Sequence, residues 1–147
     1  MITGDYRNTL DEKGRLLIPS RIRTELPGSC LVLTQGIEQC IWMFPPENWK
    51  RLSDSIMAST SPFNAQARLI QRRIIAPAQE VEIDKAGRIT IPPSLREYSR
   101  LTKDTVILGI AQYLEIWDAD EYRTYLDDKE AEFKSAAEGL GELLPFS

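Results

Sequence analysis

The chain carries near its start the stretch Asp11-Glu12-Lys13-Gly14-Arg15-Leu16-Leu17-Ile18-Pro19, and it carries the stretch again, in altered form, as Asp84-Lys85-Ala86-Gly87-Arg88-Ile89-Thr90-Ile91-Pro92. The Asp, Gly, Arg and Pro residues recur at one constant offset of 73 positions, from 11 to 84 and from 19 to 92. The similarity continues downstream after a two-residue shift, because Ile41-Trp42 corresponds to Ile116-Trp117, an offset of 75 positions. Two stretches with matching flanks indicate an internal duplication, and this repeat decides how the fold is built.

Each copy of the repeat predicts a β-hairpin. The flanking strands are expected at Tyr6–Leu10 and Arg15–Ile18 in the first copy, and at Val81–Ile83 and Arg88–Ile91 in the second. Gly14 and Gly87 stand where the turn between the strands needs a positive φ angle. Each second strand is followed by a proline, which cannot donate to a ladder and therefore ends the strand.

The remainder of each copy predicts short helices, further strands and longer helices. The short helices are expected at Ser20–Leu26 and Ser94–Leu101, the strands at Cys30–Thr34, Ile41–Phe44, Thr105–Ile110 and Tyr113–Trp117, and the longer helices at Pro46–Met57, Ala65–Ile75 and Asp118–Phe133. Asp118 is expected to cap the last helix, because its carboxylate can accept from a free N–H group of the first turn. Trp42 and Trp117 are expected to pack in the core or between the copies.

Chain length limits the architecture. Each homologous stretch, 11–52 and 84–126, has only about forty residues, and chains near that length rarely hold a core alone. The two copies should therefore pack on each other as an intramolecular pseudo-dimer with peripheral helices, which gives a β-rich α+β fold. We expect a first module at 5–52, a helical connector at 53–77, a second module at 78–126, and a C-terminal helix and tail at 127–147.

Composition excludes most enzyme designs. The chain has no histidine and only two cysteines, so neither a four-ligand Cys/His zinc site nor a Ser-His-Asp or Cys-His arrangement can form. We find no nucleophile–base pair, metal-ligand set or phosphate loop, and expect no enzyme activity, no cofactor, no metal and no small-molecule substrate. The apolar runs are too short to span a bilayer, and the first residues lack the features of a secretion signal. We therefore expect a cytoplasmic protein without a membrane partner.

Charge is distributed unevenly along the chain. The net charge is −4 and the pI is near 5.0, which taken alone argues against nucleic-acid binding. Residues 1–76, however, carry ten Lys/Arg and seven Asp/Glu, whereas residues 77–147 carry eight and fifteen. Much of the acid lies in residues 118–142, where it can be held away from a basic face, and recognition depends on the local field.

The paired motifs Asp11…Arg15 and Asp84…Arg88, with Gly4-Asp5-Tyr6 before them and Trp117 after them, resemble those of the MraZ family. The resemblance covers nearly the whole chain, and one departure is Asn8, where the family often has histidine. It implies two AbrB/SpoVT-like modules of the swapped-hairpin, double-psi-like kind. It also implies a nucleoid-associated transcriptional regulator, expected to be a repressor, that binds tandem promoter boxes upstream of division and cell wall genes as a ring-like homo-oligomer.

The motif residues suit contact with double-stranded DNA, and the resemblance implies that this DNA includes the promoter region of the protein's own gene. Arginine has a planar fork that can bind a phosphate or a guanine edge through two hydrogen bonds. Asp11 and Asp84 are expected to hold the turn and the arginine fork by accepting hydrogen bonds, and Gly14 and Gly87 to keep the turn open. The candidate DNA-binding residues are four cations on one face of the pseudo-dimer: Lys13, Arg15, Lys85 and Arg88.

Several alternatives remain open at this point. The second copy lies in the acidic half and could serve as a scaffold, so that Arg88 would not contact DNA as Arg15 does. The group Arg68, Arg72 and Arg73 could contact phosphate, face solvent or form a subunit interface. The alternative function is an antitoxin-like protein-interaction module, which predicts a long partner-binding tail, and only residues 139–147 qualify as one.

Overall fold

Two antiparallel sheets form the centre of the molecule. The computed structural model describes residues 1–145, and the last two residues of the expected tail lie outside the described residues. Within this range the larger sheet has six strands, in the order β1-β7-β8-β4-β3-β5. They are β1 (Ile2–Thr9), β7 (Asp104–Ala111), β8 (Leu114–Asp118), β4 (Ile41–Phe44), β3 (Cys30–Gln35) and β5 (Gln79–Glu82). The smaller sheet pairs β2 (Arg15–Leu17) with β6 (Arg88–Thr90).

Most of these strands pair between the two copies of the repeat. β1 of the first copy pairs with β7 of the second, and β5 of the second copy pairs with β3 of the first. β2 likewise pairs with β6, and β4 pairs with β8. The pairing expected for the first hairpin of each copy is therefore wrong, because both strands beside each turn find their partners in the other copy. By contrast, the hairpins β3–β4 and β7–β8 form within their own copies, from strands that the sequence predicted.

The exchange of strands gives both copies one hydrophobic core. Leu16 and Ile89, the central residues of β2 and β6, are buried, and so are Ile18 and Ile91, which follow these strands. All four belong to one cluster with buried side chains of β3, β4, β7 and β8. β2 and β6 have three residues each, and a strand that short cannot form a stable hairpin or bury a core alone. Each therefore needs the other copy to supply its partner strand and the rest of the core. The fold is α+β, and the packing of the two copies as a pseudo-dimer is observed.

Helices surround this centre. The short helices α1 (Ser20–Arg23) and α4 (Pro93–Tyr98) begin directly after Pro19 and Pro92. The other helical segments are α2 (Pro46–Ser59), α3 (Ala65–Ile70), the π-helical η1 (Gln71–Ile75), α5 (Ala119–Asp128), α6 (Glu130–Glu138) and the 3₁₀ segment η2 (Gly141–Leu143). The expected cap of α5 is present, since the Asp118 carboxylate accepts from the Glu121 N–H at 3.2 Å.

Two of the expected helices are interrupted. The helix expected at residues 65–75 changes from α to π geometry after Ile70. The helix expected at residues 118–133 ends at Asp128, because the N–H of Lys129 is shared between the carbonyls of Tyr125 and Leu126 and the backbone leaves the regular helix there. α6 begins after Lys129, at Glu130, and forms the C-terminal helix.

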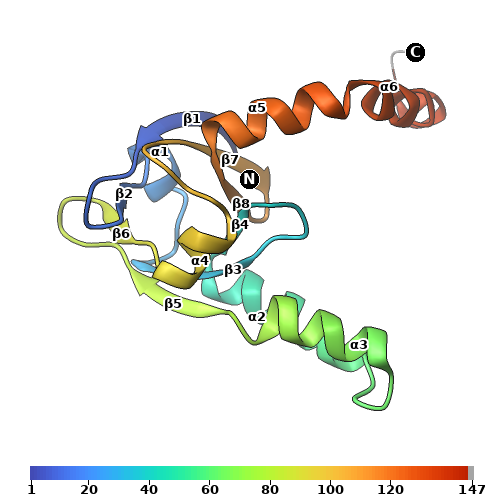
Figure 1. The fold of residues 1–147 in the computed structure, drawn as a ribbon, viewed down its shortest axis with the longest axis horizontal. Helices are drawn as coiled ribbons and strands as arrows, with labels where there is room; N and C mark the ends of the chain where they lie inside the picture. The colour runs from blue at the N-terminus through green and yellow to red at the C-terminus, as the bar shows by residue number, and fades with distance from the viewer. Residues whose placement is uncertain (146–147) are drawn as a thin grey trace.

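The turns of the repeat and the longer helices lie at different ends of the molecule. The connections β1–β2 and β5–β6 lie at the same end in Figure 1, whereas the α2–α3 and α5–α6 segments extend from the other side as two arms. Most of the acidic residues at positions 118–142 belong to the α5–α6 arm. In residues 1–145 no helix has the length and apolar character needed to cross a membrane.

The two matched tryptophans pack differently. Trp117 is 2% exposed and contacts Tyr122 and Tyr125 of α5, with ring centroids 5.2 and 5.0 Å away. Trp42 is only partly buried and lies beside Phe44 and Tyr113 at the surface. Packing is therefore confirmed for both residues, because Trp42, although only partly buried, packs against the same cluster as Trp117 and against Tyr113 of the second copy. Both cysteines of the chain are free thiols.

Candidate nucleic-acid interface

The first turn is held by the side chain of Asp11. Its Oδ1 atom accepts from the backbone N–H of Lys13 at 3.0 Å and of Arg15 at 2.8 Å. Its Oδ2 atom accepts from Nε of Arg15 at 2.7 Å. The backbone closes the same turn, because the N–H of Gly14 donates to the Asp11 carbonyl at 3.0 Å. One carboxylate therefore fixes both the turn and the direction of the arginine fork.

The second turn repeats this arrangement. Asp84 Oδ1 accepts from the backbone N–H of Ala86 and of Arg88, both at 2.9 Å. Asp84 Oδ2 accepts from Nε of Arg88 at 3.2 Å, and the Gly87 N–H donates to the Asp84 carbonyl at 2.9 Å. The hydrogen bonds expected for both aspartates are thus present, although the pair in the second turn is longer. Lys13 aligns with Ala86 and not with Lys85, so the two tips carry their lysines at different positions.

These hydrogen bonds keep both aspartates ionised. The backbone N–H of Arg15 is the main cause that lowers the pKa of Asp11 below its usual 3.8, and the Arg15 side chain adds to it. The backbone N–H of Arg88 acts in the same way on the pKa of Asp84. Partial desolvation opposes both shifts but does not cancel them.

Both motif glycines adopt a left-handed backbone conformation that favours glycine. The φ angles are +77° at Gly14 and +85° at Gly87, which strain any residue that has a Cβ atom. A Cβ at Gly14 would stand 2.7 Å from Cζ of Arg96, and a Cβ at Gly87 would stand 2.7 Å from Cζ of Arg23. Each glycine therefore provides the turn geometry and also the space for a guanidinium from the other copy.

The β2–β6 sheet brings the two motif arginines onto one face. Arg15 is opposite Thr90 in the register and Leu17 is opposite Arg88, so all four residues point to the side away from the buried Leu16 and Ile89. The side chains of Arg15 and Arg88 are 32% and 34% exposed. Each donates through Nε to its aspartate, and among the described residues neither donates through its terminal Nη atoms. Those atoms are available to an external acceptor.

The sequence reasoning missed Arg23 of α1 and Arg96 of α4. Both occupy the repeat offset of 73 positions, from 23 to 96, and that offset is the signal that could have found them. Nε of Arg23 donates to the Ile18 carbonyl at 2.9 Å. Nε of Arg96 is buried and has no acceptor in residues 1–145. The copies are therefore similar at this point but not identical.

The group Arg68, Arg72 and Arg73 is partly used inside the molecule. Arg68 donates through Nη1 to the Pro62 carbonyl at 2.9 Å. Arg73 donates through Nε to the Gln35 side chain at 3.0 Å and through Nη2 to the Tyr98 hydroxyl at 3.1 Å. Two of these three cations thus tie the α2–α3 region to itself and to the body. The terminal nitrogens of both motif arginines, by contrast, have no acceptor in residues 1–145.

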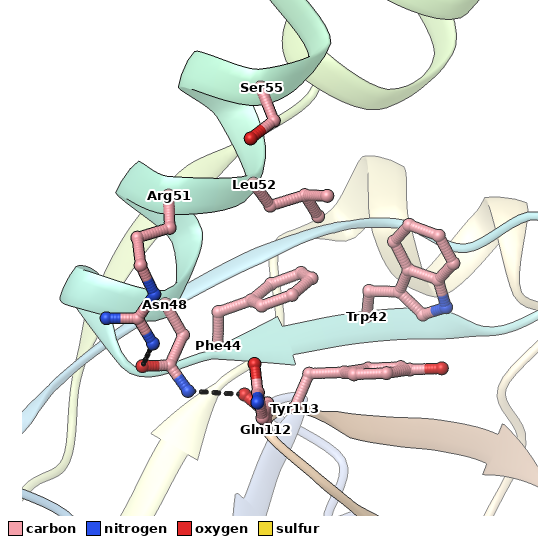
Figure 2. A pocket seen from close by; sticks show the side chains of 8 residues that line it. All are labelled: Trp42, Phe44, Asn48, Arg51, Leu52, Ser55, Gln112 and Tyr113. Carbon is pink, nitrogen blue, oxygen red and sulfur yellow. Dashed lines mark hydrogen bonds between the residues drawn. The ribbon is translucent and has the colours of Figure 1, made fainter.

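A separate pocket lies beside α2. It has a volume of about 340 Å³, and Figure 2 shows aromatic side chains from β4 and from the β7–β8 connection along its floor. Phe44 and Tyr113 stack there with ring centroids 5.5 Å apart. The polar groups on its rim satisfy each other, since Asn48 Nδ2 donates to the Gln112 carbonyl at 2.6 Å and Oδ1 accepts from Arg51 at 2.9 Å. The pocket offers an apolar contact surface and lies apart from the turns.

Comparison with known proteins identifies the family. The profile described as "MraZ protein, putative antitoxin-like" matches twice, at residues 1–73 and 74–142. A protein of Treponema denticola named transcriptional regulator MraZ is 54% identical over 142 residues, which cover 97% of this chain and 99% of that protein. Proteins of the same name from Treponema pallidum (strain Nichols) and Desulforamulus reducens are 53% and 37% identical, covering 96% and 98% of this chain and 95% and 100% of their own length. With both copies of the repeat matched, the chain belongs to the MraZ family.

Proposed function

We propose that this protein is a transcriptional regulator that binds double-stranded DNA in a sequence-specific way. Its target is the promoter region of its own gene and of a division and cell wall gene cluster, where it acts as a repressor in the cytoplasm, at the nucleoid. The relatives named transcriptional regulator MraZ support the regulatory role. The residues proposed to contact DNA are Lys13, Arg15, Lys85 and Arg88.

The arrangement of Arg15 and Arg88 carries this proposal. Both side chains lie on the outer face of the β2–β6 sheet, each is anchored at Nε by an aspartate, and each keeps its terminal nitrogens free. An anchored guanidinium loses little conformational freedom when it binds a phosphate or a guanine edge. The acidic α5–α6 arm extends from the other side of the molecule in Figure 1, so the overall charge of −4 does not describe the field at the turns.

The cross-copy pairing also supports an AbrB-like, swapped-hairpin origin for the two modules. Each turn belongs to one copy, but the strands on either side of it pair with the other. We place the modules at residues 5–52 and 78–126, with a connector at 53–77 and a C-terminal helix and tail from residue 127. In this arrangement the DNA-binding face needs both modules, which argues against a second copy that serves only as scaffold.

A ring-like homo-oligomer is part of the proposal. A single face with few cations neutralises few phosphates and binds weakly at physiological salt, whereas several linked faces on tandem boxes gain avidity. Two different surfaces expose apolar side chains that suit contacts between copies: Leu69 and Ile70 on α3, 57% and 45% exposed, and Leu126 and Phe133 on the α5–α6 arm, 46% and 66% exposed. Contact between two unlike surfaces repeats head to tail and closes into a ring when the rotation allows it.

The test is binding of the full-length protein to its own upstream duplex, measured by fluorescence anisotropy over a series of salt concentrations. A shuffled duplex of the same composition controls for sequence preference. Arg15→Ala and Arg88→Ala should each weaken binding about tenfold or more, because each removes a charge-assisted contact. Arg123→Ala is the matched control, since Arg123 lies exposed on α5 and, within residues 1–145, forms an ion pair only with Asp120.

The outcomes separate the possible roles. A loss in both motif variants supports DNA contact by both copies, and a loss in Arg15→Ala alone would make the second copy a scaffold. Equal affinity for the upstream and shuffled duplexes would contradict the regulator function. The alternative is an antitoxin-like protein-interaction module, a role that the name of the matched family also mentions. It would then gain support if the protein formed a stable complex with a partner protein through the exposed apolar residues of its arms.

A further inference from the structure

We propose that Arg23 and Arg96 bind the DNA backbone, each completing a phosphate-binding cluster that is built from both copies of the repeat. The inference rests on the DNA-binding function proposed above and extends it to residues outside the repeated motif. The first-turn cluster is Lys13, Arg15 and Arg96, and the second-turn cluster is Lys85, Arg88 and Arg23. Each cluster thus combines two cations of one copy with one cation of the other.

Contact with the turns places these two arginines in the clusters. Cζ of Arg96 lies 2.7 Å from the position of a Cβ at Gly14, and Gly14 is the residue between Lys13 and Arg15. Cζ of Arg23 has the same relation to Gly87, which directly precedes Arg88. The turns are also tied to the strand ends of the other copy, since the N–H of Ile91 donates to the Gly14 carbonyl at 2.8 Å.

The charges of these two arginines are not neutralised within the protein. Arg15 and Arg88 form ion pairs with Asp11 and Asp84, so each motif cation stands beside an anion. In the part of the chain that the structure describes, Arg23 and Arg96 form no ion pair with a carboxylate. They therefore contribute more positive potential at the turns than the paired motif arginines do.

The guanidinium of Arg23 is positioned before any ligand arrives. Its Nε donates to the Ile18 carbonyl at 2.9 Å, which leaves both terminal nitrogens without an acceptor in residues 1–145. Its Cζ end packs on a glycine, where no side chain can displace it. A guanidinium that is already held in place loses little conformational entropy when it binds a phosphate. The guanidinium of Arg96 packs on Gly14 in the same way.

The locations of the two arginines favour phosphate over base contacts. β2 and β6 are antiparallel, so the two turns, and with them Arg96 and Arg23, stand at opposite ends of the β2–β6 sheet. Arg15 and Arg88 lie between them on the outer face. A face that enters a groove meets base edges at its centre and the two sugar-phosphate backbones at its margins. Arg23 and Arg96 are therefore suited to fix the orientation of the face on DNA.

The test measures how binding of the full-length protein to its upstream duplex depends on salt, for Arg23→Gln and Arg96→Gln beside the wild type. Loss of one phosphate contact should reduce the slope of log K against log salt by about 0.9 in magnitude. Affinity at low salt should fall about tenfold. Arg23→Lys keeps the charge and should keep the slope. Arg21→Gln is the matched control, because Arg21 lies on the same helix but faces the start of β1, beside Ile2 and Thr3.

Each outcome decides the assignment. Unchanged slopes in both glutamine variants would overturn it while leaving the DNA-binding function intact, and so would an equal slope reduction in Arg21→Gln, since any surface charge would then suffice. A wild type without preference for its upstream duplex over the shuffled one would overturn the proposed function and this inference together. Should Arg23→Gln fail to fold, Arg96→Gln still gives the answer, because its Nε has no hydrogen bond to lose.

Discussion

Arg15 and Arg88 lie diagonally across the β2–β6 sheet on its outer face, although 73 positions separate them in the sequence. Arg15 is paired with Thr90 and Arg88 with Leu17, so the two arginines occupy diagonal neighbour positions, with Cα atoms about 7–8 Å apart. This spacing exists only because the copies exchange strands. A hairpin closed within each copy would not bring the two arginines into one sheet.

The same face contains Leu17, an apolar side chain that is 43% exposed and stands opposite Arg88. We predict that Leu17→Glu weakens binding to the upstream duplex about tenfold or more, because it places a negative charge against phosphate. Anisotropy titration measures the effect. Leu17→Gln, which has a similar size and no charge, should change the affinity only about twofold. Binding that survives in Leu17→Glu would show that DNA meets another face of the protein.

The sequence predicted the elements better than their pairing. The residue pattern on either side of Asp11–Gly14 predicts a strand before the turn and a strand after it. The pattern does not show whether those two strands pair with each other or with strands of the second copy. Loop length usually decides such a question in favour of the local hairpin. Here the short strand Arg15–Leu17 carries a buried residue whose neighbours come from the other copy, and this tertiary context overrides the local preference.

Helix ends and site residues show where local signals are sufficient. Asp118 starts α5 as expected, because its carboxylate caps the first turn whatever the surrounding structure. The break after Asp128 had no local signal, since no glycine or proline stands there. Arg23 and Arg96 carried the repeat signal, but they lie in helices, where a charge is ordinarily solvated. Their importance depends on Gly87 and Gly14, which only the fold brings to them.

Gly14 has two reasons to be glycine, and they can be separated. Gly14→Ala should lower the free energy of unfolding by about 1–2 kcal/mol through its positive φ angle, with a further cost from the approach of Arg96. Denaturant unfolding of Gly14→Ala, Arg96→Ala and the double variant measures the coupling between the two residues. Gly28→Ala is the control and should be nearly neutral, since in residues 1–145 no atom beyond Gly28 and its two chain neighbours lies within 4 Å of a Cβ there. Additive effects in the cycle would contradict the contact between Gly14 and Arg96.

The turns should be sensitive to acid. Hydrogen bonds to Asp11 and Asp84 hold both pKa values below the usual 3.8 in the folded protein, so folding favours the ionised form. The stability that this linkage adds is present above pH 3.8 and is lost as the pH falls below 3.8 through the folded pKa values. In urea unfolding, the wild type should therefore exceed Asp11→Asn and Asp84→Asn in stability at pH 7. The difference should shrink as the pH is lowered below 3.8, and a difference independent of pH would show that the charge of the aspartates is not what holds the turns.

Contact between unlike surfaces makes a prediction that a symmetric interface does not make. Leu69 on α3 and Phe133 on α6 are 57% and 66% exposed, and each belongs to one of the two proposed contact surfaces. Leu69→Glu or Phe133→Glu alone should convert the proposed oligomer to monomers, because a charge would replace an apolar contact in every interface. Light scattering after size-exclusion chromatography measures the mass. Ser135→Glu, which adds the same charge elsewhere on α6, should leave the oligomer intact.

Mixing the two monomeric variants completes this test. A Leu69→Glu subunit keeps an intact α6 surface, and a Phe133→Glu subunit keeps an intact α3 surface, so one unlike pair can still form between them. The mixture should therefore yield a heterodimer and nothing larger, since every further contact would need a mutated surface. If each surface instead paired with its own kind, each variant alone would already dimerise through the surface that it retains. Monomers in the mixture would show that the α3 and α6 surfaces do not meet.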